Sequence, residues 1–189
     1  MSVIKPVIKA FWAIYISIAL SYLGVGLVAP LIAIVLAERG ADSFIVGLVG
    51  TTMFAAFTAA SFPIGRMTDR IGPKPVLIGG LAVYGISILL FALITQTWLF
   101  FAARAVEGVG AAAISVATET MISQLSRPDE RAQRMSYYAL SVGAGWAAGP
   151  LAGTLLFNLQ QQLPFIACCA LSLAAAMLVY RLVPKTGPD

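Results

Sequence analysis

The stretch GRMTDRIGPKP, residues 65–75, separates two long apolar runs of the chain. It carries Arg66, Asp69, Arg70 and Lys74, although only 11% of the whole sequence is charged. The rest is correspondingly apolar, with 60% hydrophobic residues and a mean hydropathy of +0.92. Ordinary soluble domains carry about 25% charged residues. The composition therefore predicts an all-α membrane protein in which residues 65–75 form a polar turn between two spans.

The apolar runs predict six transmembrane helices, because a bilayer core of about 30 Å needs roughly 20 apolar residues per helix. Their expected ranges are 11–37, 44–65, 76–95, 98–124, 135–158 and 164–183. The segment from Ala10 to Ala37 has no charge and is long enough to span, so we expect a retained helix rather than a cleaved signal peptide. Residues 1–189 are thus predicted to form a single six-helix bundle.

Basic residues fall unevenly on the two sides that these helices define. Four groups lie on the side of the two termini: Lys5 and Lys9; Arg66, Arg70 and Lys74; Arg127, Arg131 and Arg134; and Arg181 and Lys185. The opposite side has only Arg39, which is flanked by Glu38 and Asp42. By the positive-inside rule, both termini are predicted to be cytoplasmic. The net charge of +4 is therefore explained by the orientation of the helices in the membrane. A nucleic-acid partner is not expected, because the basic residues lie between helices and do not gather on one soluble face.

The sequence offers little for catalysis or metal binding. It has no histidine, which excludes serine–histidine chemistry and histidine-ligated metals. Cys168 and Cys169 are adjacent in a predicted helix, where neighbouring side chains diverge, so they are expected to pack rather than to form a disulfide. We expect no enzyme activity, no catalytic residue, no metal and no cofactor.

Within residues 65–75, the positions of Gly65, Asp69, Gly72 and Lys74 resemble the cytoplasmic loop signature of the major facilitator superfamily. Asp69 is expected near the negative end of a helix dipole, so it needs either a cation, such as Arg70 or an arginine after the fourth helix, or the positive N-terminus of another helix. Such a pair at a moving interface can bias one conformation over another. The alternative is a solvated turn that only sets topology.

Two further segments resemble the drug:proton antiporter branch of this family. LGVGLVAP in the first helix contains Gly24 and Pro30, and the fifth helix has the antiporter spacing at Gly145, Gly149, Pro150 and Gly153. The resemblance implies that the fifth helix borders the transport pathway. The spacing alone predicts a small-residue stripe for close helix packing and a bend at the proline.

The fourth helix places Arg104, Glu107 and Glu119 in one sector of an otherwise apolar span. Ionisable residues within a membrane are candidates for function. RAVEGVG resembles the family's fourth-helix motif, whose arginine is associated with proton coupling, with Glu107 in place of a glutamine. Glu107 or Glu119 would then carry the proton. Alternatively, Arg104 and Glu107 neutralise each other and only pack, and Glu119 reaches water or pairs with Arg131 or Arg134.

The resemblance covers the whole chain but only the first of the family's two six-helix halves. It implies two inverted three-helix repeats, and Gly-Val-Gly occurs in the first helix of each predicted group, at residues 24–26 and 108–110. A second half could be another copy of the chain, a separate chain, or the rest of a longer transporter of which this chain is a fragment.

The resemblance implies a secondary active transporter that exports small organic molecules by alternating access, with the proton as coupling ion. Its setting would be the lipid bilayer of a prokaryotic inner membrane. Proton symport and uniport remain alternatives to proton-coupled export, and the sequence does not identify the substrate. The alternative from another class is a non-transporting membrane subunit or scaffold that binds a partner through the fifth-helix stripe.

Overall fold

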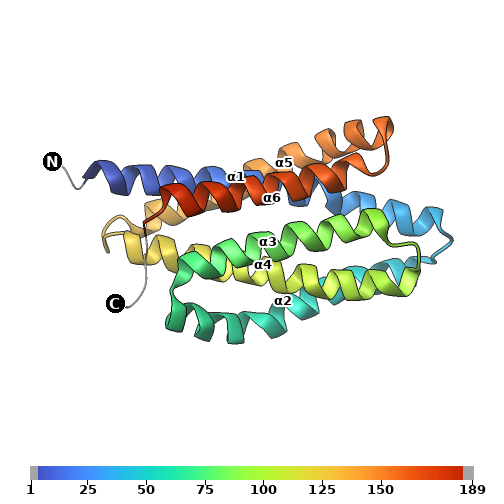
Figure 1. Cartoon of the computed structure of the whole chain (residues 1–189), viewed down its shortest axis with the longest axis horizontal. Coiled ribbons are helices and arrows are strands. Elements are labelled where there is room, and N and C mark those ends of the chain that lie inside the picture. Colours follow the sequence, from blue (N-terminus) through green and yellow to red (C-terminus); the bar gives the residue numbers. More distant parts are fainter. Residues whose placement is uncertain (1–3, 185–189) are drawn as a thin grey trace.

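Six helices form the part of the chain that the computed structural model describes, residues 4–184 (Figure 1). They are α1 (Ile4–Glu38), α2 (Ser43–Ile71), α3 (Pro73–Leu93), α4 (Thr97–Leu125), α5 (Arg131–Leu159) and α6 (Leu163–Leu182). All six are long and apolar enough to cross a membrane. Side chains are described from residue 8, so the side chain of Lys5 and all of Lys185 lie outside the described part. The all-α fold with six spans is confirmed.

Successive helices run in opposite directions, so the ends of the described chain and the α2–α3 and α4–α5 connections lie at one end of the bundle (Figure 1). We call it the basic end, because it collects Lys9, Arg66, Arg70, Lys74, Arg127, Arg131, Arg134 and Arg181. At the opposite end, Nη1 of Arg39 donates to the carbonyl oxygen of Ile94 at 2.7 Å. The cytoplasmic position of the basic end stays a prediction from charge.

The stretch 65–75 is mostly helical rather than a loop. α2 continues through Asp69 to Ile71, beyond its expected end at residue 65, because nothing between Gly65 and Ile71 breaks the helix. Gly72 alone separates α2 from α3, with a φ of 85° that glycine adopts readily. Pro73 then begins α3, where its missing N–H is harmless. The polar sequence therefore extends the helix and leaves a single-residue turn.

The contacts between helices repeat in the two halves of the chain. α1 packs mainly against α5 and α6, α4 packs mainly against α2 and α3, and α3 packs against α6. Exchanging α1, α2 and α3 with α4, α5 and α6 reproduces the same set of contacts. This interleaved arrangement is the one expected for two inverted three-helix repeats.

Glycines allow the central helices to approach closely. The glycine stripe of α5 is buried, and a Cβ atom added at Gly149 would overlap the backbone of Gly26 in α1. At the equivalent α4–α2 contact, a Cβ atom at Gly108 would overlap the carbonyl oxygen of Met53. Small residues matter in lipid because apolar helices gain little by leaving one apolar environment for another, so close packing must hold them together.

The two Gly-Val-Gly sequences serve these contacts in opposite order. In α1, Gly24 faces α6 and Gly26 faces α5, whereas in α4, Gly108 faces α2 and Gly110 faces α3. Under the exchange of repeats, α6 corresponds to α3 and α5 to α2. The likeness of the two sequences therefore reflects a shared need for small residues on two faces of a central helix, not equivalent positions in the repeats.

α2 and α5 are the least covered helices of the bundle. In the most apolar part of each helix, 11% of α2 and 17% of α5 is buried, compared with 50% of α1, α3 and α4. Large apolar side chains project outward from both, including Phe54, Phe62, Leu151 and Leu155. These two helices can contact lipid or a second bundle without any change in the fold.

The glycine contact predicts opposite effects for two similar substitutions in α5. Gly149→Ala should lower the free energy of unfolding by about 1–3 kcal/mol, because the new methyl group meets backbone that cannot move freely. Gly143→Ala should be neutral or raise it by up to about 1 kcal/mol, since this glycine faces open space and alanine favours a helix. Thermal unfolding in mild detergent measures both. Equal stability of the two variants would contradict the prediction.

Candidate functional site

Arg104 and Glu107 form a buried ion pair within α4. Nη1 of Arg104 lies 2.9 Å from Oε2 and 3.1 Å from Oε1 of Glu107. Their side chains are only 10% and 3% exposed. The three-residue spacing places both side chains on one face of the helix. Because desolvating two charges is costly even when they pair, this position is a candidate for function rather than for stability alone.

The pair does not use all of its hydrogen-bonding capacity. The hydroxyl of Tyr84 in α3 donates to Oε1 of Glu107 at 3.5 Å, which is a long contact. The guanidinium of Arg104 lies 5.7 Å from the ring centroid of Phe91. Its Nε is buried and has no hydrogen-bond partner among the described residues. Buried donors are normally paired, so this nitrogen would gain a hydrogen bond from a rearrangement that brings an acceptor to it.

A cavity of about 430 Å³ lies against the ion pair. Arg104 and Glu107 both line it, and most of the remaining wall is apolar or aromatic. These wall residues include Tyr22, Met53, Phe54, Phe57, Ile114 and Trp146. The cavity therefore offers a large apolar surface together with one pair of charges that neutralise each other.

Glu119 lies apart from this cavity, about 18 Å from Glu107 along the axis of α4 at 1.5 Å per residue. Its side chain is exposed, and its Oε1 accepts a hydrogen bond from the hydroxyl of Ser115 at 2.9 Å. Among the described residues it makes no ion pair with Arg131 or Arg134. The structure therefore gives the two acids of α4 separate environments.

The first residues of the 65–75 stretch lie on the exposed part of α2 at the basic end. Gly65 faces open space, and Asp69 and Arg70 are exposed. The expected ion pair of Asp69, with Arg70 or with an arginine after α4, is absent from the part of the chain that the structure describes. Asp69 is therefore accessible to a partner that approaches α2 from outside the bundle.

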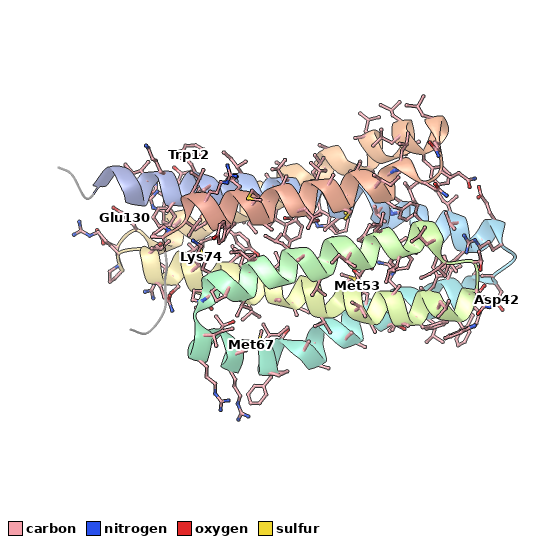
Figure 2. The ribbon with its side chains drawn as sticks, in the orientation of Figure 1. Trp12, Asp42, Met53, Met67, Lys74 and Glu130 are labelled. Atoms are coloured by element: carbon pink, nitrogen blue, oxygen red, sulfur yellow. The ribbon has the colours of Figure 1, made fainter. Side chains whose placement is uncertain are left out.

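The end of the same stretch is held firmly. The N–H of Gly72 donates to the carbonyl oxygen of Thr68 at 2.9 Å. Nζ of Lys74 donates to the carbonyl oxygens of Tyr180 at 2.9 Å and Val183 at 2.5 Å, at the end of α6. Figure 2 shows Lys74 where α3 begins beside α6. A cation at these carbonyl groups stabilises the helix C-terminus.

The antiporter-like residues contact other helices of the same bundle. Gly24 is buried against Cys168 of α6, and the stripe Gly145, Gly149 and Gly153 is buried against α1. Pro30 and Pro150 are exposed, and both helices continue through them. Since the stripe is already occupied by α1, it is not the surface through which a scaffold protein would bind another chain.

Sequence reasoning missed the aromatic residues of the site. Tyr22, Tyr84 and Trp146 line the cavity, but Tyr22 and Tyr84 lie outside the motifs and Trp146 occupies an unspecified position between Gly145 and Gly149. One signal was available: Tyr84 places a hydroxyl in the middle of the predicted span 76–95, where a polar group needs a partner for the same reason as Glu107. Tyr22 and Trp146 carry no comparable signal, because their position depends on how α1 and α5 cross.

No residue set is assigned to a metal or cofactor. The described residues include no group of three His, Cys, Asp or Glu side chains placed to hold a metal ion. Cys168 and Cys169 are buried free thiols of α6.

The ion pair predicts a strong dependence of stability on charge balance. Glu107→Gln leaves Arg104 buried without a counter-charge and should destabilise the fold by about 3–5 kcal/mol. The double variant Arg104→Gln/Glu107→Gln should recover much of this loss. As a control, Glu130→Gln breaks a pair whose side chains are 24% and 39% exposed, and should cost less than about 1 kcal/mol. Thermal unfolding of the variants measures these changes in stability. If the loss in the double variant equals the sum of the losses in Arg104→Gln and Glu107→Gln, the two residues are not coupled.

The sequence matches known membrane transporters over most of its length. Residues 14–189 match the family model of the Major Facilitator Superfamily. The chain is 31% identical over 181 residues to multidrug resistance protein 2 of Bacillus subtilis (strain 168), covering 89% of this chain and 42% of that protein. It is 25% identical over 174 residues to quinolone resistance protein NorA of Staphylococcus aureus, covering 90% of this chain and 44% of that protein.

The fold of this chain also matches that of solved transporter structures. The crystal structure of a bacterial homolog of the human lysosomal transporter Spinster, inward-facing and unoccupied, aligns with a TM-score of 0.81 at 16% identity. The alignment covers 97% of this chain and 45% of that one, so the chain spans less than half the length of these three proteins. The chain belongs to the Major Facilitator Superfamily, whose members are transporters and not enzymes.

Proposed function

We propose that this chain forms one half of a secondary active transporter that exports small amphipathic molecules in exchange for protons by alternating access. The observation that carries the proposal is the buried Arg104–Glu107 pair in the wall of an apolar cavity. Two relatives whose names refer to multidrug and quinolone resistance support export as the direction of transport.

A second six-helix bundle is needed to complete the cavity. Its wall comes from α1, α2, α4 and α5, with Tyr84 from α3, and α2 and α5 are the least covered helices. A second bundle that packs against α2 and α5 would cover the face of the cavity that the other helices of this bundle leave uncovered. Because the two halves of such transporters are parallel repeats, a second copy of this chain, a separate chain or a further segment of a longer chain could all supply it.

The cavity wall favours an amphipathic organic substrate. Aromatic and aliphatic side chains form most of the wall, and Trp146 is 45% exposed, so its indole ring is available for stacking. Arg104 and Glu107 neutralise each other, so the resting cavity presents no net charge from this pair. Such a wall selects for apolar area and shape more than for a particular charged group.

Glu107 is the proposed proton carrier. While ionised, it balances Arg104; when protonated, it leaves Arg104 as an uncompensated cation in the cavity wall. An unbalanced charge in that position favours entry of water or a change of packing, which connects proton binding to the state of the cavity. Glu119, exposed nearer the basic end, is proposed to exchange protons with water on that side.

The proposed orientation places the basic end in the cytoplasm of a prokaryotic cell, because cations concentrate there. Asp69 is exposed at this end and lacks an ion-pair partner among the described residues, so it is proposed to meet a cation or helix N-terminus of the second half. Such a contact would form in only one arrangement of the two bundles and would bias the conformational equilibrium.

Proton coupling predicts a selective effect of Glu107→Gln on transport. In proteoliposomes that contain the completed transporter, an imposed pH gradient should drive uptake of a fluorescent amphipathic dye. Glu107→Gln should abolish this gradient-driven uptake while downhill dye movement persists, because the substituted residue can no longer exchange a proton. Glu130→Gln is the matched control, since Glu130 lies outside the six candidate spans. A wild-type protein that moves dye equally with and without the gradient would indicate a uniporter.

The proposed interface predicts where a second bundle can be crosslinked. Leu151 on α5 is 71% exposed and Leu173 on α6 is 46% exposed. With a second copy as partner, Leu151→Cys should be joined to its copy in membranes by a flexible bifunctional thiol reagent, which tolerates the separation that a two-fold axis leaves between equivalent residues, and Leu173→Cys should not. The native cysteines are buried and should remain unreactive. A dimer through Leu173→Cys alone would place the interface on the wrong side of the bundle.

A further inference from the structure

A second hollow of the bundle lies between α1 and α5 near the basic end. It has a volume of about 530 Å³ and is lined largely by apolar and aromatic residues, with Arg134 as the only charged residue among the described residues that line it. Trp12, Ile16 and Leu140 line it and are 63%, 49% and 67% exposed. The hollow is therefore an open groove on the outside of the bundle, within the length of the membrane-spanning segments.

This groove faces away from the transport cavity. Ala144 lines the groove and Trp146 lines the cavity. Two residues along a helix turn by about 200°, so these side chains leave α5 on opposite sides. A second bundle that covers the cavity would thus leave the groove open to lipid.

The groove ends at a guanidinium with spare donors. Nη2 of Arg134 pairs with Oε2 of Glu130 at 3.0 Å, and its Cζ lies 4.4 Å from the ring centroid of Phe11. Nε of Arg134 is buried and has no hydrogen-bond partner among the described residues. Glu130 thus occupies Nη2, and the buried Nε is out of reach of a ligand in the groove, so Nη1 is the nitrogen left for another acceptor.

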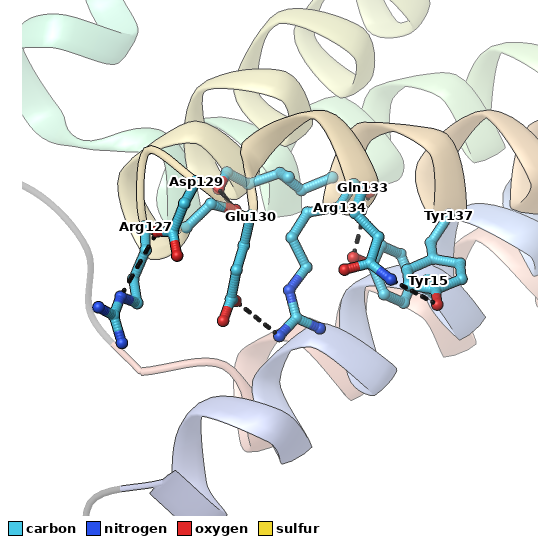
Figure 3. A network of polar contacts seen from close by, with 9 residues as sticks. Tyr15, Arg127, Asp129, Glu130, Gln133, Arg134 and Tyr137 are labelled. Carbon is cyan, nitrogen blue, oxygen red and sulfur yellow. Dashed lines mark hydrogen bonds and ion pairs between the residues drawn. The ribbon is translucent and has the colours of Figure 1, made fainter.

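Aromatic side chains hold this end of the groove in place. The hydroxyl of Tyr15 donates to the backbone carbonyl oxygen of Arg134 at 3.2 Å, and the rings of Tyr15 and Tyr137 lie 6.0 Å apart. Figure 3 shows Tyr15, Arg134 and Tyr137 together where α1 and α5 meet, with Glu130 beside the arginine. Trp12 at the rim is labelled in Figure 2. Tyrosine and tryptophan prefer the boundary between acyl chains and headgroups, which sets the depth of this site in the bilayer.

We propose that this groove binds an anionic phospholipid, with its phosphate at Arg134 and an acyl chain along Trp12, Ile16, Leu140 and Ala144. A phospholipid matches the two parts of the groove: its charged phosphate corresponds to the end at Arg134, and its apolar chain corresponds to the apolar wall. Arginine suits phosphate since its planar N–H groups can bind two oxygens at once. Lys9 and Arg131 are further exposed cations near this end of α1 and α5 and favour a negative headgroup.

The groove could be filled by acyl chains of any lipid, so the test must separate the chain from the phosphate. The full chain, stripped of lipid in mild detergent, is mixed with phosphatidylglycerol, with diacylglycerol of the same acyl chains, or with glycerol 3-phosphate. Bound adducts are counted by native mass spectrometry. Phosphatidylglycerol should bind about tenfold more tightly than diacylglycerol, as expected for one charge-assisted contact, and glycerol 3-phosphate should not displace it.

Two pairs of variants locate the site. Arg134→Gln should weaken phosphatidylglycerol binding about tenfold, whereas Arg127→Gln should not, because Arg127 is 78% exposed and lies outside the groove. Ala144→Phe should block the acyl chain, whereas Ala139→Phe should not, because Ala139 is exposed about 140° away on the same helix. If Arg134→Gln does not fold, Arg134→Lys replaces it, since lysine keeps the charge but lacks the fork of donors.

Loss of binding in Arg134→Gln and Ala144→Phe, with both controls unchanged, supports the proposal. Equal losses in Arg127→Gln and Arg134→Gln would show general surface attraction and overturn it. Equal binding of diacylglycerol would remove the role of the phosphate. Displacement of the lipid by glycerol 3-phosphate would mean an anion site instead of a lipid site. Each of these three results is incompatible with the proposed occupant.

Discussion

The close contact between α1 and α5 determines how the bundle is organised. Glycines at the contact bring the two backbones together, and a Cβ atom at Gly149 would overlap Gly26. The cavity with the buried ion pair opens on one side of this contact, and the groove beside Arg134 opens on the other. Because lipid provides no solvent-driven force between apolar helices, small changes at this contact would alter both hollows together.

The equivalent packing of α4 explains why the site can hold charges. α4, which carries Arg104 and Glu107, packs against α2 and α3 in the way that α1 packs against α5 and α6. Both central helices are therefore enclosed while α2 and α5 stay exposed. In the enclosed region, ions and water screen the Arg104–Glu107 attraction little, and each of the two charges needs the other to remain buried. The surface pair Arg127–Asp129 is 78% and 70% exposed and contributes little to stability.

Much of this fold follows from local sequence patterns, and the rest depends on how helices cross. Apolar runs reveal six spans, and a three-residue spacing brings Arg104 and Glu107 onto one face. The end of α2 was missed because a polar segment can remain helical outside lipid, and α2 stops where Gly72 takes a positive φ and Pro73 follows. Tyr22 and Trp146 reach the cavity from helices far apart in sequence, which no local pattern encodes.

The single-residue turn at Gly72 has a mechanical consequence. Consecutive Cα atoms are about 3.8 Å apart, so the chain has no slack between α2 and α3, and a tilt of α2 must pull on the start of α3. Lys74 stands two residues further on and is hydrogen-bonded to the last carbonyl groups of α6. A force applied to the exposed face of α2 would therefore be passed through α3 to the end of α6, so these three helices would move together at the basic end.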